Sequence, residues 1–243
     1  MPSGAKSSPK TEISRELVRR FEAAYGETPY TVRFDPMQEL ISCILSQHTS
    51  DANSYPAFDR LQVKFPSWQQ VVDAGPEAVA DVIRSAGLAN QKAKSIIRCL
   101  VEIKARTGEY SIDHLRNMPL KEAREWLTEL PGVGPKTASI VLCFAMGMAA
   151  IAVDTHVYRV SWRVGLIPEE IGENKAHDIL LQVVPPDLAF RFHMALIHHG
   201  RQTCKAPLPL CDKCMVTDLC RWYKRGGPKK KAIEIKKRRL ART

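Results

Sequence analysis

Apolar side chains recur at helical spacing from the start of the chain. Between Thr11, which can cap a helix, and Gly26, which can end one, the apolar positions repeat with the period of an amphipathic helix. A second stripe follows Asp35, a capping residue, and Pro36, which suits a first helical turn. Its apolar positions have the spacing of a buried helix and are Met37, Leu40, Ile41, Ile44 and Leu45. The pattern predicts two helices, the second of them buried.

The same signals return at short intervals along the rest of the chain. Ser67 and Gln70 form a capping box, and Asn90 and Asp187 are further candidate caps. The expected helices are 51–65, 67–75, 76–86, 90–108, 121–129, 135–145, 154–164, 174–184 and 188–199. No strand-like alternation persists apart from the brief apolar run 149–153. The chain is therefore predicted to be all-α, as a compact helical fold of one or two lobes.

A glycine-rich turn separates two of these helices at residues 130–135. Gly132 and Gly134 carry no side chains, so the backbone can turn sharply and its N–H groups can come close to a phosphate. Pro135 favours the start of the next helix. For a lone Gly-x-Gly, an ordinary turn between helices is the favoured explanation, and only the residues around it favour another. The alternative is a helix-hairpin-helix that holds a DNA backbone through amide groups of residues 132–134 and the first turn at Thr137.

Two charged residues near helix starts are candidates for chemistry. Lys136 lies on the first turn after the hairpin, where the positive end of the helix dipole favours the neutral, nucleophilic amine. The simpler interpretation is a lysine that contacts phosphate. Asp154 lies eighteen residues later, at another expected helix start. It is either a plain N-cap or a carboxylate that stabilises positive charge on a sugar while its glycosidic bond breaks.

The charge of the chain is concentrated at one end. Residues 226–243 hold eight Lys or Arg and one Glu, which accounts for +7 of the net charge of +10. This tail is either a solvated, disordered extension or an addition to DNA affinity that depends on salt. No apolar run is long enough for a membrane span, and residues 1–10 are expected to form a flexible, polar leader. We expect an intracellular protein, in the cytoplasm or nucleoid if it is bacterial or archaeal.

Four of the seven cysteines crowd into a short segment. Their spacing is Cys-x6-Cys-x2-Cys-x5-Cys, and they are Cys204, Cys211, Cys214 and Cys220. Four thiolates this close indicate a metal site, but spacing alone leaves zinc and an iron–sulfur cluster both open. The other three cysteines lie among apolar residues and are expected to be inert core. The adjacent His198 and His199 point apart on a helix, so one is expected to pack near the cysteines rather than bind metal.

The motifs together resemble the endonuclease III family of DNA glycosylases. The resemblance is carried by Leu-Pro-Gly-Val-Gly-x-Lys-Thr-Ala from Leu130, Ala-Val-Asp-Thr-His-Val from Ala152, and the cysteine cluster, in that order, and covers residues 11–223. It implies a two-lobed fold. One lobe is a six-helix barrel with the helix-hairpin-helix at 36–149, and the other is a helical cluster domain at 11–35 with 150–225; the basic tail is 226–243.

The resemblance also implies roles for individual residues. Lys136 would be the nucleophile and Asp154 its electrostatic and proton-transfer partner, while the four cysteines would hold a [4Fe–4S] cluster. Gln47, at the end of the second helix, and Leu88, in Gly-Leu-x-x-x-Lys-Ala, would fill the gap left when a base is extruded from the duplex.

The activity implied is base excision from duplex DNA that contains damaged bases or abasic sites. The enzyme would be a monomeric glycosylase and AP lyase that removes oxidised pyrimidines through a lysine Schiff base and then cuts the strand by β-elimination. Two alternatives stay open. One is a monofunctional mismatch or uracil-type glycosylase of the same superfamily, and the other is a non-catalytic DNA-binding module with iron–sulfur or zinc.

Overall fold

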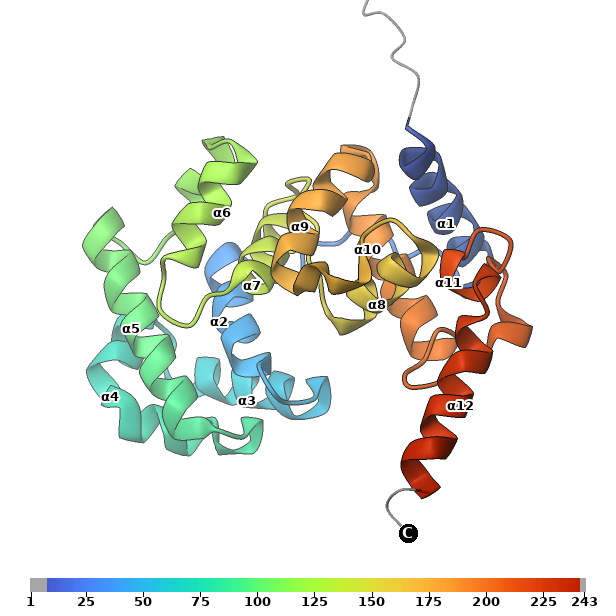
Figure 1. Ribbon diagram of the computed structural model, residues 1–243. Helices are drawn as coiled ribbons and strands as arrows, with labels where there is room; N and C mark the ends of the chain where they lie inside the picture. Colours follow the sequence, from blue (N-terminus) through green and yellow to red (C-terminus); the bar gives the residue numbers. More distant parts are fainter. Residues whose placement is uncertain (1–7, 241–243) are drawn as a thin grey trace, which may run out of the picture. The chain divides into compact units, whose positions relative to one another are not determined.

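The chain folds into helices joined by short loops (Figure 1). The structure is a computed structural model that describes residues 8–240, without the side chains of residues 238–240. No strand occurs among the described residues. The prediction of an all-α fold is confirmed. Within the same residues, no helix combines the length and apolarity needed to cross a membrane.

Contacts divide the chain into two compact units. Unit 1 contains the described residues up to Tyr30 together with those from Ala149 onward, and unit 2 is Thr31–Met148. Of the expected leader, residues 1–7 lie outside the described residues, whereas Pro9 and Lys10 belong to the first helix.

Unit 2 is built around α2 (Pro36–Ser46), whose apolar residues are buried on all sides. A capping box of Asp35 and Gln38 starts this helix, as the sequence predicted for Asp35. The helix packs against α3, α5, α7 and the π-helical segment η3. The remaining elements are α3 (Asp51–Lys64), α4 (Trp68–Val82), η1 (Arg84–Ala86), α5 (Ala89–Thr107), η2 (Asp113–Asn117), α6 (Leu120–Thr128), α7 (Pro135–Ile140) and η3 (Val141–Ala145).

Unit 1 joins the two ends of the chain around one apolar core. Helix α1 (Pro9–Tyr25) packs along α10 (Ala189–Gln202), and α10 packs on α8 (Thr155–Val164). Phe21 and Phe192 are fully buried among valines and leucines of these helices. The other elements are η4 (Glu169–Ile171), α9 (Gly172–Val183), η5 (Pro186–Leu188), η6 (Cys211–Lys213), α11 (Arg221–Lys224) and α12 (Gly227–Leu240).

Several expected helix starts are wrong because other residues take the capping position. Ser8, not Thr11, caps α1, and its hydroxyl accepts the N–H of Thr11. The N-cap of α5 is Leu88, whose backbone has a left-handed conformation, so Asn90 already lies inside the helix. Asp187 lies in η5, and α10 begins only at Ala189. Each error spans one to three residues, where competing local caps are hard to rank from sequence.

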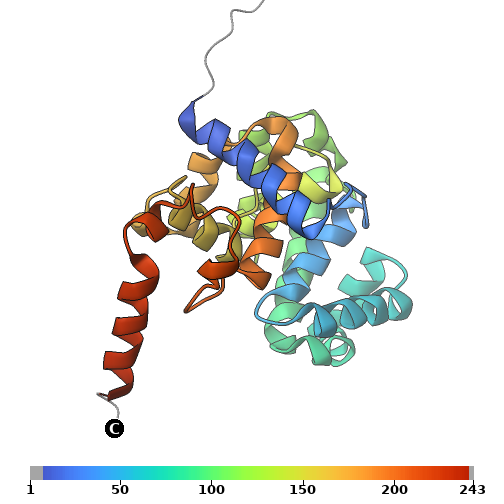
Figure 2. The ribbon, with the colours of Figure 1, turned by 90° about the vertical axis from the view of Figure 1, so that its right-hand side faces the viewer.

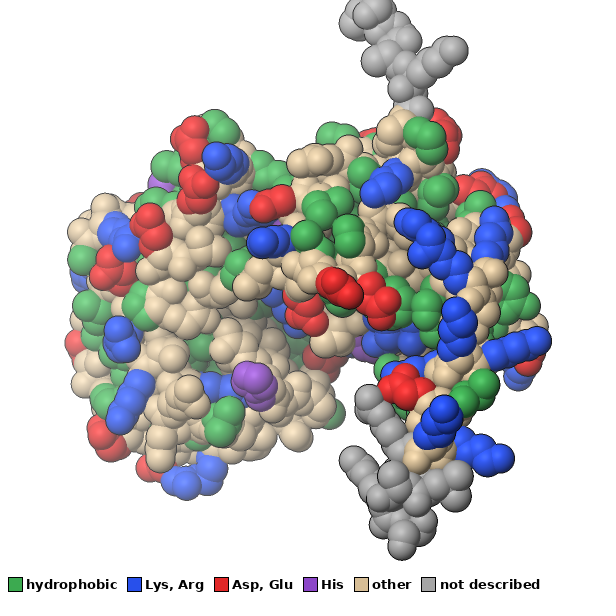
Figure 3. All heavy atoms as spheres, viewed as in Figure 1, with side chains coloured by type: hydrophobic (Ala, Val, Ile, Leu, Met, Phe, Trp, Pro, Cys, Tyr) green, Lys and Arg blue, Asp and Glu red, His purple; other side chains and the backbone are tan. Residues whose placement is uncertain are grey.

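The basic tail is helical over the residues that the structure describes. Helix α12 extends away from the rest of unit 1 in both ribbon views (Figures 1 and 2). The expectation of a disordered extension is therefore wrong for Gly227–Leu240, and residues 241–243 lie outside the described residues. Lys and Arg side chains gather along this helix (Figure 3). A role in DNA affinity stays a prediction.

Candidate functional site

The glycine-rich turn forms a tight hairpin between α6 and α7. The N–H groups of Leu130 and Val133 donate to the carbonyls of Leu127 and Leu130, which closes two successive turns. Gly132 has φ +81°, a left-handed conformation that favours glycine, and an added Cβ would lie 3.1 Å from Cβ of Ser95 on α5. The hairpin backbone is therefore fixed by its own bonds and by the packing of α5 behind it.

Gly134 is a glycine for a different reason. Its φ of −97° is open to any residue, and a Cβ added there meets nothing within 4 Å. No described residue accepts a hydrogen bond from the N–H of Gly132 or Gly134. Both glycines are exposed, whereas Val133 is buried and uses its N–H inside the turn. The exposed N–H groups without an acceptor are those of the two glycines. Because Gly134 has no side chain, a ligand from solvent can approach its N–H closely.

Lys136 stands at the start of the helix that follows the hairpin. Gly134 is the N-cap and Pro135 the first residue of α7, as predicted. The side chain of Lys136 is exposed, while Thr137 beside it is buried. Helix α7 runs only to Ile140 and then widens into the π-helical η3, where the sequence predicted one continuous helix to residue 145. The arrangement presents a solvent-facing amine directly beside the two bare amides.

Gln47 is tied to this hairpin. It ends α2, and its Nε2 donates to the carbonyl of Gly132 at 2.9 Å. The next residue, His48, has φ +55°, so the chain reverses direction at this point. The structure thus brings Gln47 to the hairpin that carries Lys136, although 85 residues separate Gln47 from Gly132.

Leu88 combines two unusual properties. Its side chain is 56% exposed, and its backbone is left-handed, with φ 50° and ψ 34°. For a leucine this conformation costs about 1–2 kcal/mol relative to the right-handed helix. Gly87 before it has φ +67°. An exposed, strained leucine of this kind needs support from its surroundings, and it presents an apolar side chain to solvent.

Asp154 belongs to unit 1, where it caps α8. Its Oδ1 accepts the N–H groups of His156 at 2.9 Å and Val157 at 2.7 Å. No described residue donates a hydrogen bond to Oδ2, and the side chain is half-buried. The capping role is therefore confirmed, and it leaves one carboxylate oxygen for other chemistry.

Helix α8 also anchors the cysteine segment. Arg159 donates to the carbonyls of Cys204 at 2.8 Å and Gly200 at 3.0 Å, and to Nδ1 of His156. Burial lowers the pKa of His156, so its ring is held neutral as an acceptor for this arginine. An added Cβ at Gly200 would lie 2.8 Å from Cβ of His156. The helix that Asp154 begins is thus locked to the first of the four cysteines.

The four cysteines of the cluster segment line one cavity. Its walls include Val160, Val164, Val216 and Trp222 beside the thiols. Among the described residues, no three His, Cys, Asp or Glu side chains are grouped to hold a single metal ion. Burial, and then the charges of the other three cysteines, raises the pKa of Cys211 to about 11. Such a thiol ionises readily only beside a strong positive charge, as a bound metal supplies.

His199 packs beside these cysteines, as predicted. It is 1% exposed, stacks on Phe21 at 4.1 Å between ring centroids, and has Nε2 3.8 Å from Sγ of Cys214. The hydroxyl of Tyr25 lies 2.9 Å from its Nδ1. Burial lowers the pKa of His199 to about 4, so the ring is neutral at neutral pH.

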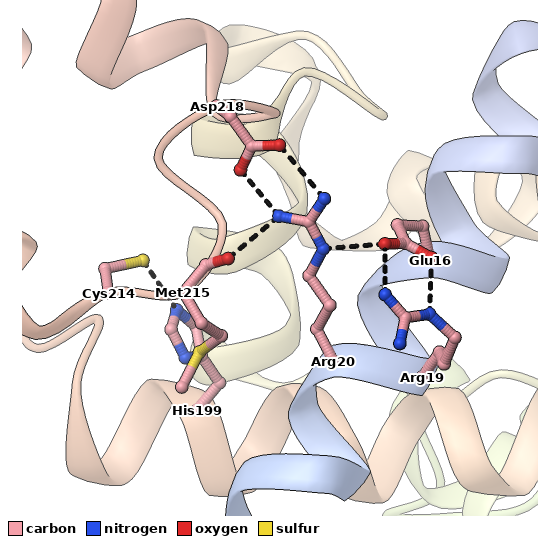
Figure 4. A network of polar contacts seen from close by, with 7 residues as sticks. All are labelled: Glu16, Arg19, Arg20, His199, Cys214, Met215 and Asp218. Carbon is pink, nitrogen blue, oxygen red and sulfur yellow. Dashed lines mark hydrogen bonds and ion pairs between the residues drawn. The ribbon is translucent and has the colours of Figure 1, made fainter.

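An arginine of α1 holds the loop that carries the last two cysteines (Figure 4). The guanidinium of Arg20 donates to both carboxylate oxygens of Asp218, at 2.6 and 3.0 Å, and to the carbonyl of Met215 at 2.9 Å. Its Nε donates to Glu16 at 2.7 Å. Hydrogen bonds from Arg19 and Arg20 lower the pKa of Glu16 to about 2. Sequence analysis missed this network, because it joins residues almost two hundred positions apart.

The other three cysteines are core residues, as expected. Cys43, Cys99 and Cys143 are buried, and burial raises the pKa of Cys99 and Cys143 to about 12. Burial raises the pKa of Cys43 well above its usual value as well. These thiols therefore stay protonated and have no metal-binding character.

Sequence comparisons match most of this chain. Residues 41–186 match the model of the HhH-GPD superfamily of base excision DNA repair proteins. Endonuclease III of Thermotoga maritima is 36% identical over 219 residues, which cover 89% of this chain and 94% of the relative. Endonuclease III of Escherichia coli K12 is 36% identical over 188 residues, covering 77% and 84%.

A comparison of folds leads to the same group of proteins. A solved structure of endonuclease III trapped as a covalent intermediate with DNA superposes with a TM-score of 0.74 at 30% identity. The match covers 90% of this chain and 98% of the other.

Proposed function

Because the chain belongs to the endonuclease III family within the HhH-GPD superfamily, it is a DNA glycosylase with AP lyase activity, and we propose which of its residues carry that activity. Lys136 is the nucleophile, and Asp154 is its partner in charge stabilisation and proton transfer. The amides of Gly132 and Gly134 grip a phosphate of the DNA, while Val133 and Thr137, which the sequence also assigned to DNA binding, are buried and support the hairpin from within. The observation that supports these roles most strongly is that the exposed Lys136 lies beside two exposed backbone N–H groups that have no acceptor among the described residues.

The reaction follows from these assignments. The amine of Lys136 attacks C1′ of the deoxyribose, a C–N bond forms, and the damaged base leaves with the electrons of the glycosidic bond. Asp154 stabilises the positive charge on the sugar and accepts a proton from the attacking amine. The C1′–O4′ bond of the sugar ring then breaks, its oxygen takes a proton, and a Schiff base forms between C1′ and the lysine nitrogen. This Schiff base acidifies C2′, and loss of a C2′ proton expels the 3′ phosphate. Water then hydrolyses the Schiff base and frees the lysine.

The substrate belongs to the proposal as well. We propose duplex DNA with an oxidised pyrimidine or an abasic site, bound by an intracellular monomer that acts in the cytoplasm or nucleoid if the source is bacterial or archaeal. Gln47 and Leu88 occupy the space left by the extruded base, because Leu88 presents an exposed apolar side chain and Gln47 a side chain fixed to the hairpin. The monofunctional alternative loses support from Lys136, which a glycosylase without lyase activity does not require.

The cysteines would hold a [4Fe–4S] cluster. The family carries this group, and four crowded thiols around one cavity with apolar walls fit it. When bound, the cluster supplies the positive charge that keeps these thiolates ionised, and it fixes the segment between α10 and α11. Arg159 and Arg20 then transmit that order to α8 and α1.

Paired substitutions test the assignments. Lys136→Gln should lower base release and strand cleavage by several orders of magnitude, because the nucleophile is gone. Lys121→Gln, an exposed lysine on the preceding helix, is the control and should retain both activities. Asp154→Asn keeps a residue that caps helices well, so stability should hold while base release falls by about a hundredfold or more. Full activity in either Lys136→Gln or Asp154→Asn would refute the role of that residue.

A further inference from the structure

Lys92 is the only lysine among the fully described side chains that is buried. It is 4% exposed and lies on the apolar face of α5 with Ala93, Ile96 and Leu100. No carboxylate of the described residues lies within ion-pair distance of its ammonium, and burial lowers its pKa. A charge in such a place is costly unless hydrogen bonds hold it. The two carbonyls that accept hydrogen bonds from Lys92 therefore indicate why a lysine is buried here.

Both acceptors are carbonyls at the ends of helices. Nζ of Lys92 donates to the carbonyl of Leu45 at 2.6 Å and to that of Ala86 at 2.8 Å. Leu45 lies in the last turn of α2, and Ala86 is the last residue of η1. Carbonyls at these positions have no partner within their own helix. Lys92 thus bridges two helix ends that are 41 residues apart in sequence.

Each of those helix ends leads directly into a residue proposed to enter the DNA. Gln47 follows Leu45 by two residues, and Leu88 follows Ala86 by two. The backbone N–H of Lys92 also donates to the carbonyl of Leu88 at 2.9 Å. Lys92 therefore holds the strained Gly87–Leu88 pair from both sides, through its side chain before the pair and its backbone after it.

These hydrogen bonds, together with the short stretches of backbone between them, form one continuous connection within unit 2. It runs from Gly132 of the hairpin to Gln47, through the end of α2 to Leu45, and through Lys92 to the loop at Leu88. A residue that is inserted into stacked bases must keep its position against the resistance of the duplex. Fixing two such residues to one another preserves the distance between them.

We infer that Lys92 is a positioning residue for base extrusion, which fixes Gln47 and Leu88 relative to one another and to the DNA-binding hairpin. The inference rests on the proposed function. It concerns the step in which a paired base leaves the stack, and not the chemistry at Lys136. A loss of Lys92 should therefore affect substrates that need extrusion far more than substrates that do not.

The test compares Lys92→Met, which keeps an unbranched buried chain without the charge, with Lys94→Met, an exposed lysine on the same helix. Single-turnover rates are measured on a duplex with one oxidised pyrimidine and on an abasic site in single-stranded DNA. Lys92→Met should be roughly 10- to 100-fold slower on the duplex and within about 3-fold of wild type on the single strand. Fluorescence of a 2-aminopurine beside the lesion should show slower unstacking.

A double-mutant cycle with Leu88→Ala separates positioning from general stability. If Lys92 acts through Leu88, adding Lys92→Met to Leu88→Ala should lower the duplex rate by less than Lys92→Met lowers it in wild type. Additive losses, equal losses on both substrates, or no loss would overturn the inference. Should Lys92→Met fail to fold, Lys92→Arg replaces it, because it keeps the charge but moves the donors, and the same ratio of rates decides. A wild type inactive on both substrates would overturn the proposed function itself.

Discussion

The two glycines of the hairpin should respond in opposite ways to the same added methyl group. Gly132→Ala forces alanine into φ +81° and places Cβ 3.1 Å from Ser95. The left-handed conformation costs about 1–2 kcal/mol, and the stiffer unfolded chain returns about 0.4–1 kcal/mol. Gly134→Ala meets no atom within 4 Å at an ordinary φ, so only the second, stabilising effect acts. The two variants should therefore differ by about 1–2 kcal/mol in free energy of unfolding.

The affinity for DNA should fall in Gly134→Ala, although this variant is not destabilised. Gly134→Ala leaves the fold intact but puts a methyl group where the proposal places a phosphate. A hydrogen bond to a charged group contributes about 1.5–3 kcal/mol, so its loss should weaken duplex binding about 10- to 100-fold.

Urea unfolding and fluorescence anisotropy with a lesion duplex, at one fixed salt concentration, measure the two quantities. Wild-type affinity in Gly134→Ala would refute the grip by hairpin amides. Equal free energies of unfolding in Gly132→Ala and Gly134→Ala would refute the backbone argument.

Three further predictions follow from other parts of the molecule. Asp154→Ala should lower the free energy of unfolding by about 1 kcal/mol through the lost cap, whereas Asp154→Asn should not; equal stabilities in a melting experiment would contradict this. Removing the metal with a chelator, or replacing Cys211 by Ser, should abolish brown colour and bound iron measured chemically; colourless protein with one bound zinc would contradict the cluster. Glu16 has a pKa of about 2 instead of its usual 4.5, so the stability it contributes is complete above about pH 4.5 and is lost as the pH falls towards 2; Glu16→Gln should flatten the acid limb of stability against pH, and an unchanged limb would contradict the assignment.

The features that the sequence predicted correctly are helix caps and helix ends, which depend on residues close together in the chain. The cap at Asp35, the capping box at Ser67 and the cap at Asp154 are interactions between residues two or three positions apart, and the structure contains all three. Gly26 and Gly108 end helices, as their freedom at positive φ suggests. The all-α fold follows from the same local signals.

The parts that were missed depend on residues far apart in the chain. Lys92 stands on an apolar helix face, a signal visible in the sequence, but its acceptors at Leu45 and Ala86 appear only when α2, η1 and α5 pack together. Arg20 on the cysteine loop is a case of the same kind. For the tail, one of the two interpretations of its charge run was a disordered extension, yet α12 forms there.

Trapping of the Schiff base tests the central claim most directly. Borohydride is added while the protein acts on a duplex with one oxidised pyrimidine, and the linked peptide is identified by mass spectrometry. The account predicts a covalent adduct on Lys136 in the wild type and none in Lys136→Ala. An adduct on another residue, an undiminished adduct in Lys136→Ala, or no adduct on either the damaged duplex or an abasic site would contradict it.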